Sequence, residues 1–174
     1  MMWIENVSIV IVEKGFHQDA GPNSMVIRIQ DPGVEFLPTK HQFKEEHRFE
    51  FLDIEVDGQS NDGTGMMVDM SEFAITERQA EDLVMLLRRA YFNRMNVVVH
   101  CHAGMCRSGA VTEVGVEFGF EDVGNARTPN LMVKHFMRRA LGWTYDSTEK
   151  PYHVRATNPN AAPGVVGFIE DEPG

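Results

Sequence analysis

Residues 97–108 carry the feature that most constrains the fold, because a strand, a tight loop and a helix start follow one another without interruption. Three consecutive valines over 97–99 are typical of a strand at the centre of a parallel sheet, where both faces are buried. A helix is predicted to follow over 107–118. With the other predicted elements, this unit indicates an α/β domain whose central, mainly parallel sheet is flanked by helices.

The remaining elements are predicted from periodicity and from capping signals. Thr76, followed three positions later by Gln79, has the pattern of a capping box at a helix start. The apolar residues that follow recur at helical spacing, whereas β-branched or alternating segments indicate strands. The predicted strands span 3–12, 25–29 and 49–56, a loop spans 58–65, and the further helices span 76–92 and 130–141.

The length and the composition are those of one globular domain. The chain has 174 residues, of which 43% are hydrophobic and 24% are charged, enough to bury a core in a single domain. Near the C-terminus large apolar side chains become scarce, and Asn, Pro, Ala and Gly predominate. We therefore expect one domain over residues 1–153 and a flexible tail over 154–174.

Charge, hydropathy and cysteine content limit the partners and the compartment. The net charge of −10 opposes long-range attraction of nucleic acid or of an anionic membrane surface. No apolar run approaches the roughly 20 residues that span a bilayer, and the N-terminal residues lack the pattern of a signal peptide. The two cysteines, Cys101 and Cys106, are too few and too close for a secreted disulfide framework. These features favour a cytoplasmic protein without a membrane or nucleic-acid partner.

The loop after the valine strand has the composition of an anion cradle built around a nucleophile. A loop between a strand and a helix directs backbone N–H groups inward, and the helix N-terminus adds partial positive charge. Cys101 opens this loop, where such donors favour its thiolate form. Arg107 closes it and can hold two phosphate oxygens at once. Gly104 supplies conformational freedom, and Ser108 can donate a hydrogen bond to the thiolate when Cys101 leaves in a second step.

The other loop residues complete the predicted phosphate-binding group. That group consists of His102, Ala103, Gly104, Met105, Cys106 and Ser108. The histidines and cysteines of the loop lack the paired spacing of a metal site, so no metal is expected. His100 fits a buried orienting residue better than a base. Cys106 is either loop filler or a partner that forms a reversible disulfide with Cys101 under oxidation.

This motif resembles the signature of cysteine-based protein tyrosine and dual-specificity phosphatases. In that signature His-Cys, five residues and Arg-Ser follow one another, as they do from His100 to Ser108, and Gly104 falls at the family's loop glycine. Residues 26–33 are similar to a stretch in small bacterial and viral members. The resemblance implies a protein-tyrosine-phosphatase-like fold of the dual-specificity type. It also implies a cysteinyl-phosphate intermediate, with no metal or organic cofactor.

The resemblance implies further that an aspartate protonates the leaving oxygen from a loop before the helix that precedes the catalytic strand. Here that loop spans residues 57–75. Asp57 comes directly after the predicted strand, as in the relatives, and we expect it to be the acid. Asp69 is the close alternative, because it lies 32 positions before Cys101, a spacing typical of small dual-specificity members. The remaining candidates are Asp62 and Asp53, of which Asp53 fits a structural role better.

The substrate class is the least determined feature. The loop interior carries no lysine and the chain is acidic, which argues against a polyphosphorylated lipid. A phosphorylated protein is therefore expected, with phosphotyrosine as the main target and phosphoserine or phosphothreonine as a further one. The alternatives are an RNA 5′-triphosphatase of the same superfamily and a rhodanese-like sulfurtransferase, whose six-residue loop lacks the Arg-Ser ending.

Overall fold

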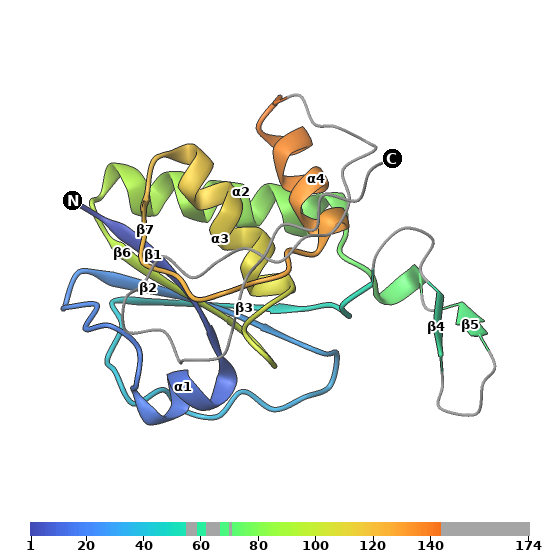
Figure 1. The fold of residues 1–174 in the computed structure, drawn as a ribbon, viewed down its shortest axis with the longest axis horizontal. Coiled ribbons are helices and arrows are strands. Elements are labelled where there is room, and N and C mark those ends of the chain that lie inside the picture. Colours follow the sequence, from blue (N-terminus) through green and yellow to red (C-terminus); the bar gives the residue numbers. More distant parts are fainter. Residues whose placement is uncertain (55–58, 62–66, 70, 144–174) are drawn as a thin grey trace.

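The computed structural model describes residues 1–54, 59–61, 67–69 and 71–143 (Figure 1). The strands are β1 (Trp3–Ser8), β2 (Ser24–Gln30), β3 (Glu45–Glu50), β4 (Gln59–Asn61), β5 (Met67–Asp69), β6 (Asn96–Cys101) and β7 (Glu121–Asp122). The helices are α1 (Ile9–Lys14), α2 (Glu77–Phe92), α3 (Arg107–Phe118) and α4 (Leu131–Ala140), with a 3₁₀ turn, η1, at Ser71–Phe73.

Five strands form one sheet in the order β3-β2-β6-β1-β7, and every pairing between them is parallel. The predicted α/β class with a mainly parallel sheet is therefore confirmed. β6 lies between β1 and β2, and its valines are buried on both faces of the sheet, as the apolar run predicts. Because all strands run the same way, their carboxyl ends meet at one edge, where β6 delivers Cys101.

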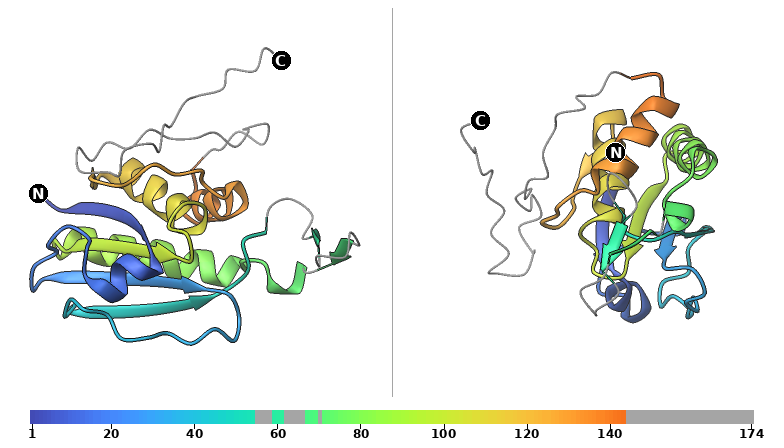
Figure 2. Two further views of the ribbon diagram at one scale, coloured as in Figure 1. Left: turned by 60° about the horizontal axis from the view of Figure 1, so that its bottom comes forward. Right: turned by 90° about the vertical axis from the view of Figure 1, so that its right-hand side faces the viewer.

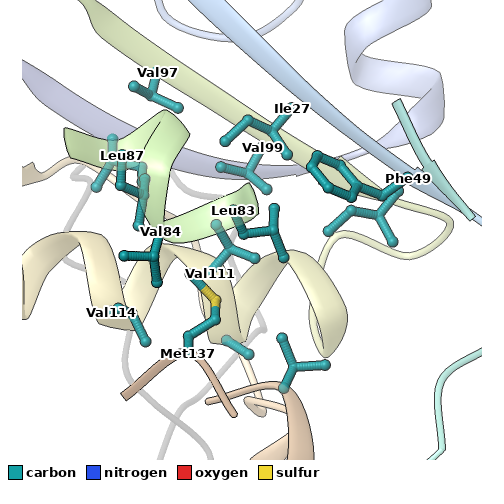
Figure 3. Close-up of a cluster of buried hydrophobic side chains, with 14 of the residues drawn as sticks. Ile27, Phe49, Leu83, Val84, Leu87, Val97, Val99, Val111, Val114 and Met137 are labelled. Carbon is teal, nitrogen blue, oxygen red and sulfur yellow. The ribbon is translucent and has the colours of Figure 1, made fainter. Parts of the chain in front are cut away.

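Helices cover both faces of the sheet. α2, α3 and α4 lie on one face and α1 lies on the other (Figures 1 and 2). Side chains alternate between the faces of a strand, so Val97 and Val99 pack into the core beneath α2, α3 and α4 (Figure 3), whereas Val98 packs with Val12 of α1. The core under the three helices is the larger one. Its labelled members in Figure 3 include Ile27, Phe49, Leu83, Leu87, Val111, Val114 and Met137.

The capping signals of the sequence are confirmed at α2. The Thr76 hydroxyl accepts a hydrogen bond from the Gln79 N–H at 3.1 Å, and the Gln79 side chain accepts one from the Thr76 N–H at 2.9 Å. This reciprocal pair satisfies backbone donors at the helix start that have no partner within the helix. The predicted helices over 107–118 and 130–141 are also present, the second one residue shorter at each end.

The strand predicted over 3–12 is wrong in its second half, because β1 ends at Ser8 and α1 follows. Ser8 caps this helix by accepting a hydrogen bond from the Ile11 N–H at 3.4 Å, and Gly15 ends it with φ of 71°. The β-branched residues favour a strand locally, but β1 has already reached the sheet edge where Ser8 pairs with Cys101. Tertiary packing, including the burial of Val12, overrides the local propensity.

The third strand also differs from its prediction over 49–56. β3 spans Glu45–Glu50 and residues 51–54 lie outside a strand. β3 is the edge strand, and its last pair joins Glu50 to Gln30, the final residue of β2. Beyond Gln30 no partner strand continues, so the acidic–apolar alternation after Glu50 has nothing to pair with.

The short strands β4, β5 and β7 were not predicted as strands. The loop predicted over 58–65 contains β4, which pairs antiparallel with β5. β7 is only two residues long, too short to leave a pattern in the sequence. The tail predicted over 154–174 lies outside the described residues. Among the helices that the structure describes, none combines the length and the apolar character needed to cross a membrane.

Candidate active site

The strand, loop and helix start predicted around Cys101 occupy the carboxyl edge of the sheet. Cys101 is the last residue of β6 and Arg107 is the first residue of α3, so the intervening loop spans 102–106. The Cys101 thiol is 2% exposed, and its Sγ lies 3.2 Å from the hydroxyl Oγ of Ser108. A hydroxyl at that distance can donate to a thiolate. The structure therefore brings together the predicted nucleophile and its predicted hydrogen-bond donor.

Three carbonyl groups of the loop are held from outside by donors of other elements. The donors are one backbone N–H at the start of α1, one buried side-chain amide of β1 and one backbone N–H at the start of α4. The pairs are His102 O with Ile9 N at 3.3 Å, Gly104 O with Asn6 Nδ2 at 2.8 Å, and Cys106 O with Asn130 N at 2.9 Å. Every second carbonyl of the loop is thus turned away from its interior.

This pattern fixes the direction of the backbone N–H groups. In a trans peptide the N–H points opposite to the C=O of the same unit, and the described chain contains no cis peptide. The N–H groups that follow the three held carbonyls belong to Ala103, Met105 and Arg107. They therefore point into the loop, where they add to the positive end of α3. Such a set of convergent donors is suited to bind a tetrahedral anion.

Gly104 sits at the point where the loop presses against β1. Its φ of 75° lies in the left-handed region, and a Cβ there would come within 2.3 Å of the Val7 carbonyl carbon and 2.4 Å of the Ser8 nitrogen. Both atoms are backbone, so neither can turn aside. Only glycine fits this position without a shift of β1 or of the loop.

Gly104→Ala should destabilise the fold by about 2–4 kcal/mol, through the left-handed backbone and through overpacking against β1. Gly21→Ala is the matched control, because Gly21 has φ of 71° but nothing within 4 Å of an added Cβ. Denaturant unfolding should show a loss of only about 1–2 kcal/mol for the control. Equal losses for the two variants would mean that the contact with β1 imposes no cost.

Arg107 is held at the same edge by the ends of two neighbouring strands. The residue is 5% exposed, and its guanidinium Nη1 donates to Asp31 Oδ1 at 2.7 Å and to the Phe51 carbonyl at 2.7 Å. Asp31 directly follows β2, and Phe51 directly follows β3. The Nε of Arg107 is buried and has no hydrogen-bond partner among the described residues. A buried donor of this kind fits an anion bound in the loop, since leaving it unpaired is costly.

His100 precedes Cys101 and is fully buried. Its Nε2 accepts a hydrogen bond from Arg28 Nε at 2.9 Å, and its Nδ1 lies 3.4 Å from the Cys101 carbonyl. Burial, reinforced by the positive charge of Arg28, lowers the pKa of His100 to about 3. The ring is therefore neutral near pH 7 and carries its proton on Nδ1, because Nε2 acts as the acceptor. This state suits the predicted orienting role and not that of a base.

The candidate acids of the long loop are only partly described. Asp57 and Asp62 lie outside the described residues. Asp69 is the last residue of β5. Asp53 is exposed, and its Oδ1 accepts a hydrogen bond from Asn130 Nδ2 at 2.7 Å. This hydrogen bond ties Asp53 to the start of α4, in keeping with the structural role expected for it.

The structure also places at the site residues that were not predicted to belong to it. Asp31 was included only in the 26–33 stretch that is similar to small bacterial and viral phosphatases, yet its carboxylate pairs with Arg107. Its position directly after a strand next to β6 was the available signal, because carboxyl ends of parallel strands share an edge. Asn6 and Asn130 gave no signal of their own, since nothing local in the sequence relates them to the loop.

The remaining loop residues differ in their exposure. His102 and Ala103 are exposed, Met105 and Cys106 are half-buried, and Gly104 and Ser108 are buried. Among the residues that the structure describes, no group of three or more His, Cys, Asp or Glu side chains could hold a metal ion.

Comparison with known proteins adds no family assignment. No model of a known protein family matches the chain, and a search of curated proteins finds no matching relative.

Proposed function

We propose that this chain is a cysteine-dependent phosphomonoester hydrolase of the dual-specificity protein-tyrosine-phosphatase type. One observation carries the proposal. At one edge of the sheet lie Cys101 Sγ at the end of β6, the N–H groups of the loop that follows, and the Arg107 guanidinium and Ser108 hydroxyl at the start of α3. Phosphoryl transfer to cysteine requires a nucleophilic thiol next to a set of anion-binding N–H groups, together with an arginine that can hold two phosphate oxygens.

The first step forms a cysteinyl-phosphate. The Cys101 thiolate donates an electron pair to phosphorus, and the bond from phosphorus to the ester oxygen breaks. That oxygen takes its proton from an aspartic acid, for which we propose Asp57, with Asp69 as the alternative. The loop N–H groups and Arg107 hold the three equatorial oxygens as charge redistributes among them.

The second step returns the enzyme to its starting state. The same aspartate removes a proton from a water molecule, which attacks phosphorus and releases inorganic phosphate. The sulfur–phosphorus bond breaks and Cys101 leaves as a thiolate, which the Ser108 hydroxyl stabilises by donating a hydrogen bond. The net reaction consumes one phosphomonoester and one water. It yields one alcohol or phenol and one phosphate, with no redox change and no cofactor.

A phosphorylated protein is the proposed substrate, with phosphotyrosine as the main target. The only cationic side chain between Cys101 and Ser108 is Arg107, which suits a single phosphoryl group better than a polyphosphate. The net charge of −10 disfavours RNA. Neither cysteine is part of a disulfide, and a nucleophilic thiol persists in a reducing compartment, so we place the activity in the cytoplasm.

The purified chain should hydrolyse p-nitrophenyl phosphate at an undiminished rate in excess EDTA, because no step of the mechanism uses a metal. A phosphotyrosine peptide should be dephosphorylated faster than its phosphoserine and phosphothreonine counterparts, and triphosphate-ended RNA should release no phosphate. Phosphate release measured on the five substrates in parallel tests the proposal.

The opposing outcomes are distinct. Activity that disappears with EDTA would contradict the cysteine mechanism. Phosphate release fastest from triphosphate-ended RNA would replace the proposed substrate by the RNA alternative. Formation of thiocyanate from thiosulfate and cyanide, without phosphate release from any ester, would identify a sulfurtransferase.

A further inference from the structure

Asn6 is a fully buried amide in the middle of β1 that contacts the phosphate loop. Its Nδ2 donates to the Gly104 carbonyl at 2.8 Å, across 98 positions of sequence. Apolar residues would fill this place in the sheet at lower cost, because a buried amide must find partners for all of its polar atoms. The hydrogen bond therefore marks a specific contact, and it fixes the direction of the Gly104 carbonyl.

The neighbours of Asn6 determine which way its amide points. Its Oδ1 accepts a hydrogen bond from the Asn125 N–H at 3.0 Å, and Arg127 Nη1 lies 3.5 Å from the same oxygen. The Gly104 carbonyl can only accept and the Asn125 N–H can only donate, so the opposite orientation of the amide would lose both bonds. The NH₂ group of Asn6 is thereby committed to Gly104.

Ion pairs hold Arg127, the residue whose guanidinium lies beside the Asn6 side chain. Arg127 is 1% exposed, and Nη2 donates to Asp122 Oδ2 at 2.7 Å and to Glu113 Oε2 at 2.9 Å. In addition, the Asn125 side chain donates to the main-chain carbonyl of Asn6 at 2.8 Å. This network, which belongs to α3 and to the segment after it, prevents Asn6 from following the loop if the loop moves.

We propose that Asn6 is a positioning residue of the phosphate cradle. By holding the Gly104 carbonyl outward, it turns the Met105 N–H of the same peptide into the loop, where a phosphoryl oxygen would bind. Asn6 does not touch that oxygen, but the direction of one of its backbone donors depends on this side chain. The inference rests on the proposed function, in that it assumes an oxyanion as the ligand of the loop.

Asn6→Asp removes the Nδ2–H donor to the Gly104 carbonyl. The variant keeps the shape and the acceptor oxygen, and it replaces the NH₂ group that faces Gly104 by an oxygen, with the added negative charge beside Arg127. Carboxylate and carbonyl oxygens repel each other, so the Gly104–Met105 peptide loses its fixed direction. We expect kcat/KM for p-nitrophenyl phosphate to fall about 100-fold, the order of loss that accompanies misplacement of a reacting geometry. Affinity for tungstate, an inert tetrahedral oxyanion, should fall about 10-fold or more.

Two further variants separate positioning from stability. Asn23→Asp makes the same chemical change at the opposite edge of the sheet, where the amide donates to the carbonyls of Asn93 and Arg94. It should keep both activity and tungstate affinity. Asn96→Asp removes the donor to the Ala20 carbonyl at the start of β6, at the opposite end of that strand from Cys101, so it should lower the unfolding midpoint while leaving tungstate affinity within about twofold of wild type.

The amide resonance of Met105 gives a readout that a merely structural role would not move. In wild-type protein, tungstate should shift the N–H resonances of Ala103, Met105 and Arg107 downfield. In Asn6→Asp the shift of Met105 should be lost while that of Ala103 remains. Retained tungstate affinity together with an unchanged Met105 shift would overturn the inference. Absence of tungstate binding and of phosphatase activity in wild-type protein would instead overturn the proposed function.

Discussion

Cys101→Ser should lose p-nitrophenyl phosphate turnover by about 10⁶-fold, the order of loss that removal of the nucleophile produces in a hydrolytic enzyme. A serine hydroxyl is far less ionised than a thiol near neutral pH. Among the described residues, the neighbouring His100 is not suited to act as its general base, because its pKa is lowered to about 3 and its Nε2 accepts a hydrogen bond from Arg28. The reaction therefore stops before the phosphorus–oxygen bond breaks. Phosphate release over hours at high enzyme concentration measures the residual rate.

The same variant should still bind tungstate with an affinity within about threefold of wild type. Serine occupies less volume than cysteine, keeps a hydrogen-bond partner for Ser108, and leaves the loop N–H groups and Arg107 in place. Calorimetric titration together with the thermal midpoint establishes that the cradle is intact. Turnover above one-hundredth of the wild-type rate would show that another group attacks phosphorus, and the proposed mechanism would then fail.

The strand, loop and helix start around Cys101 could be predicted because their determinants are consecutive in the sequence. A buried strand, a glycine with a left-handed backbone and an arginine at a helix start are all present within residues 97–108, and each acts on its immediate neighbours. The start of α2 was predictable for the same reason, since its capping box joins Thr76 to Gln79. Local signals of this kind survive folding unless tertiary packing opposes them.

The groups that support the loop could not be predicted, because they are distant in sequence. Asn6 lies 98 positions from Gly104, and Asp31 lies 76 positions from Arg107. Their contacts depend on strand order, which places β1 and β2 on either side of β6, and on a parallel register that brings the strand ends together. A prediction that strands are parallel does not specify which of them are neighbours.

The ends of β1 and β3 also depend on strands that are distant in sequence. Residues 9–12 have the composition of a strand but begin a helix, since β1 ends where its pairing with β6 ends. β3 begins four positions before its prediction and stops at Glu50, because β2 ends opposite that residue. In both cases the partner strand, and not the segment's own sequence, decides where the strand stops. The choice among Asp57, Asp62 and Asp69 depends on placement in the same way.

Arg107→Ala should lower kcat/KM by about 10³–10⁵-fold, as expected for an arginine that stabilises a transferring phosphoryl group. Unlike Cys101→Ser, it should also abolish measurable tungstate binding, because the guanidinium supplies the only side-chain cation of the loop. Arg107→Lys should recover little of either, since an ammonium group cannot present two parallel donors to one oxyanion. Steady-state kinetics and calorimetric titration on the three proteins distinguish these effects.

Arg78→Ala is the matched control, because Arg78 also pairs with an aspartate, Asp82, but does so on the exposed surface of α2. It should leave both kinetics and tungstate binding unchanged, since such surface pairs contribute little. The kcat/KM and the tungstate affinity of Asp31→Asn should lie between those of Arg107→Ala and Arg78→Ala. In this variant the Phe51 carbonyl still accepts a hydrogen bond from Arg107, but the guanidinium is less firmly oriented. If Arg107→Ala bound tungstate as tightly as wild type, the backbone N–H groups alone would form the anion site. Arg107 would then serve to tie α3 to the ends of β2 and β3, and phosphoryl transfer would lose its principal source of charge stabilisation.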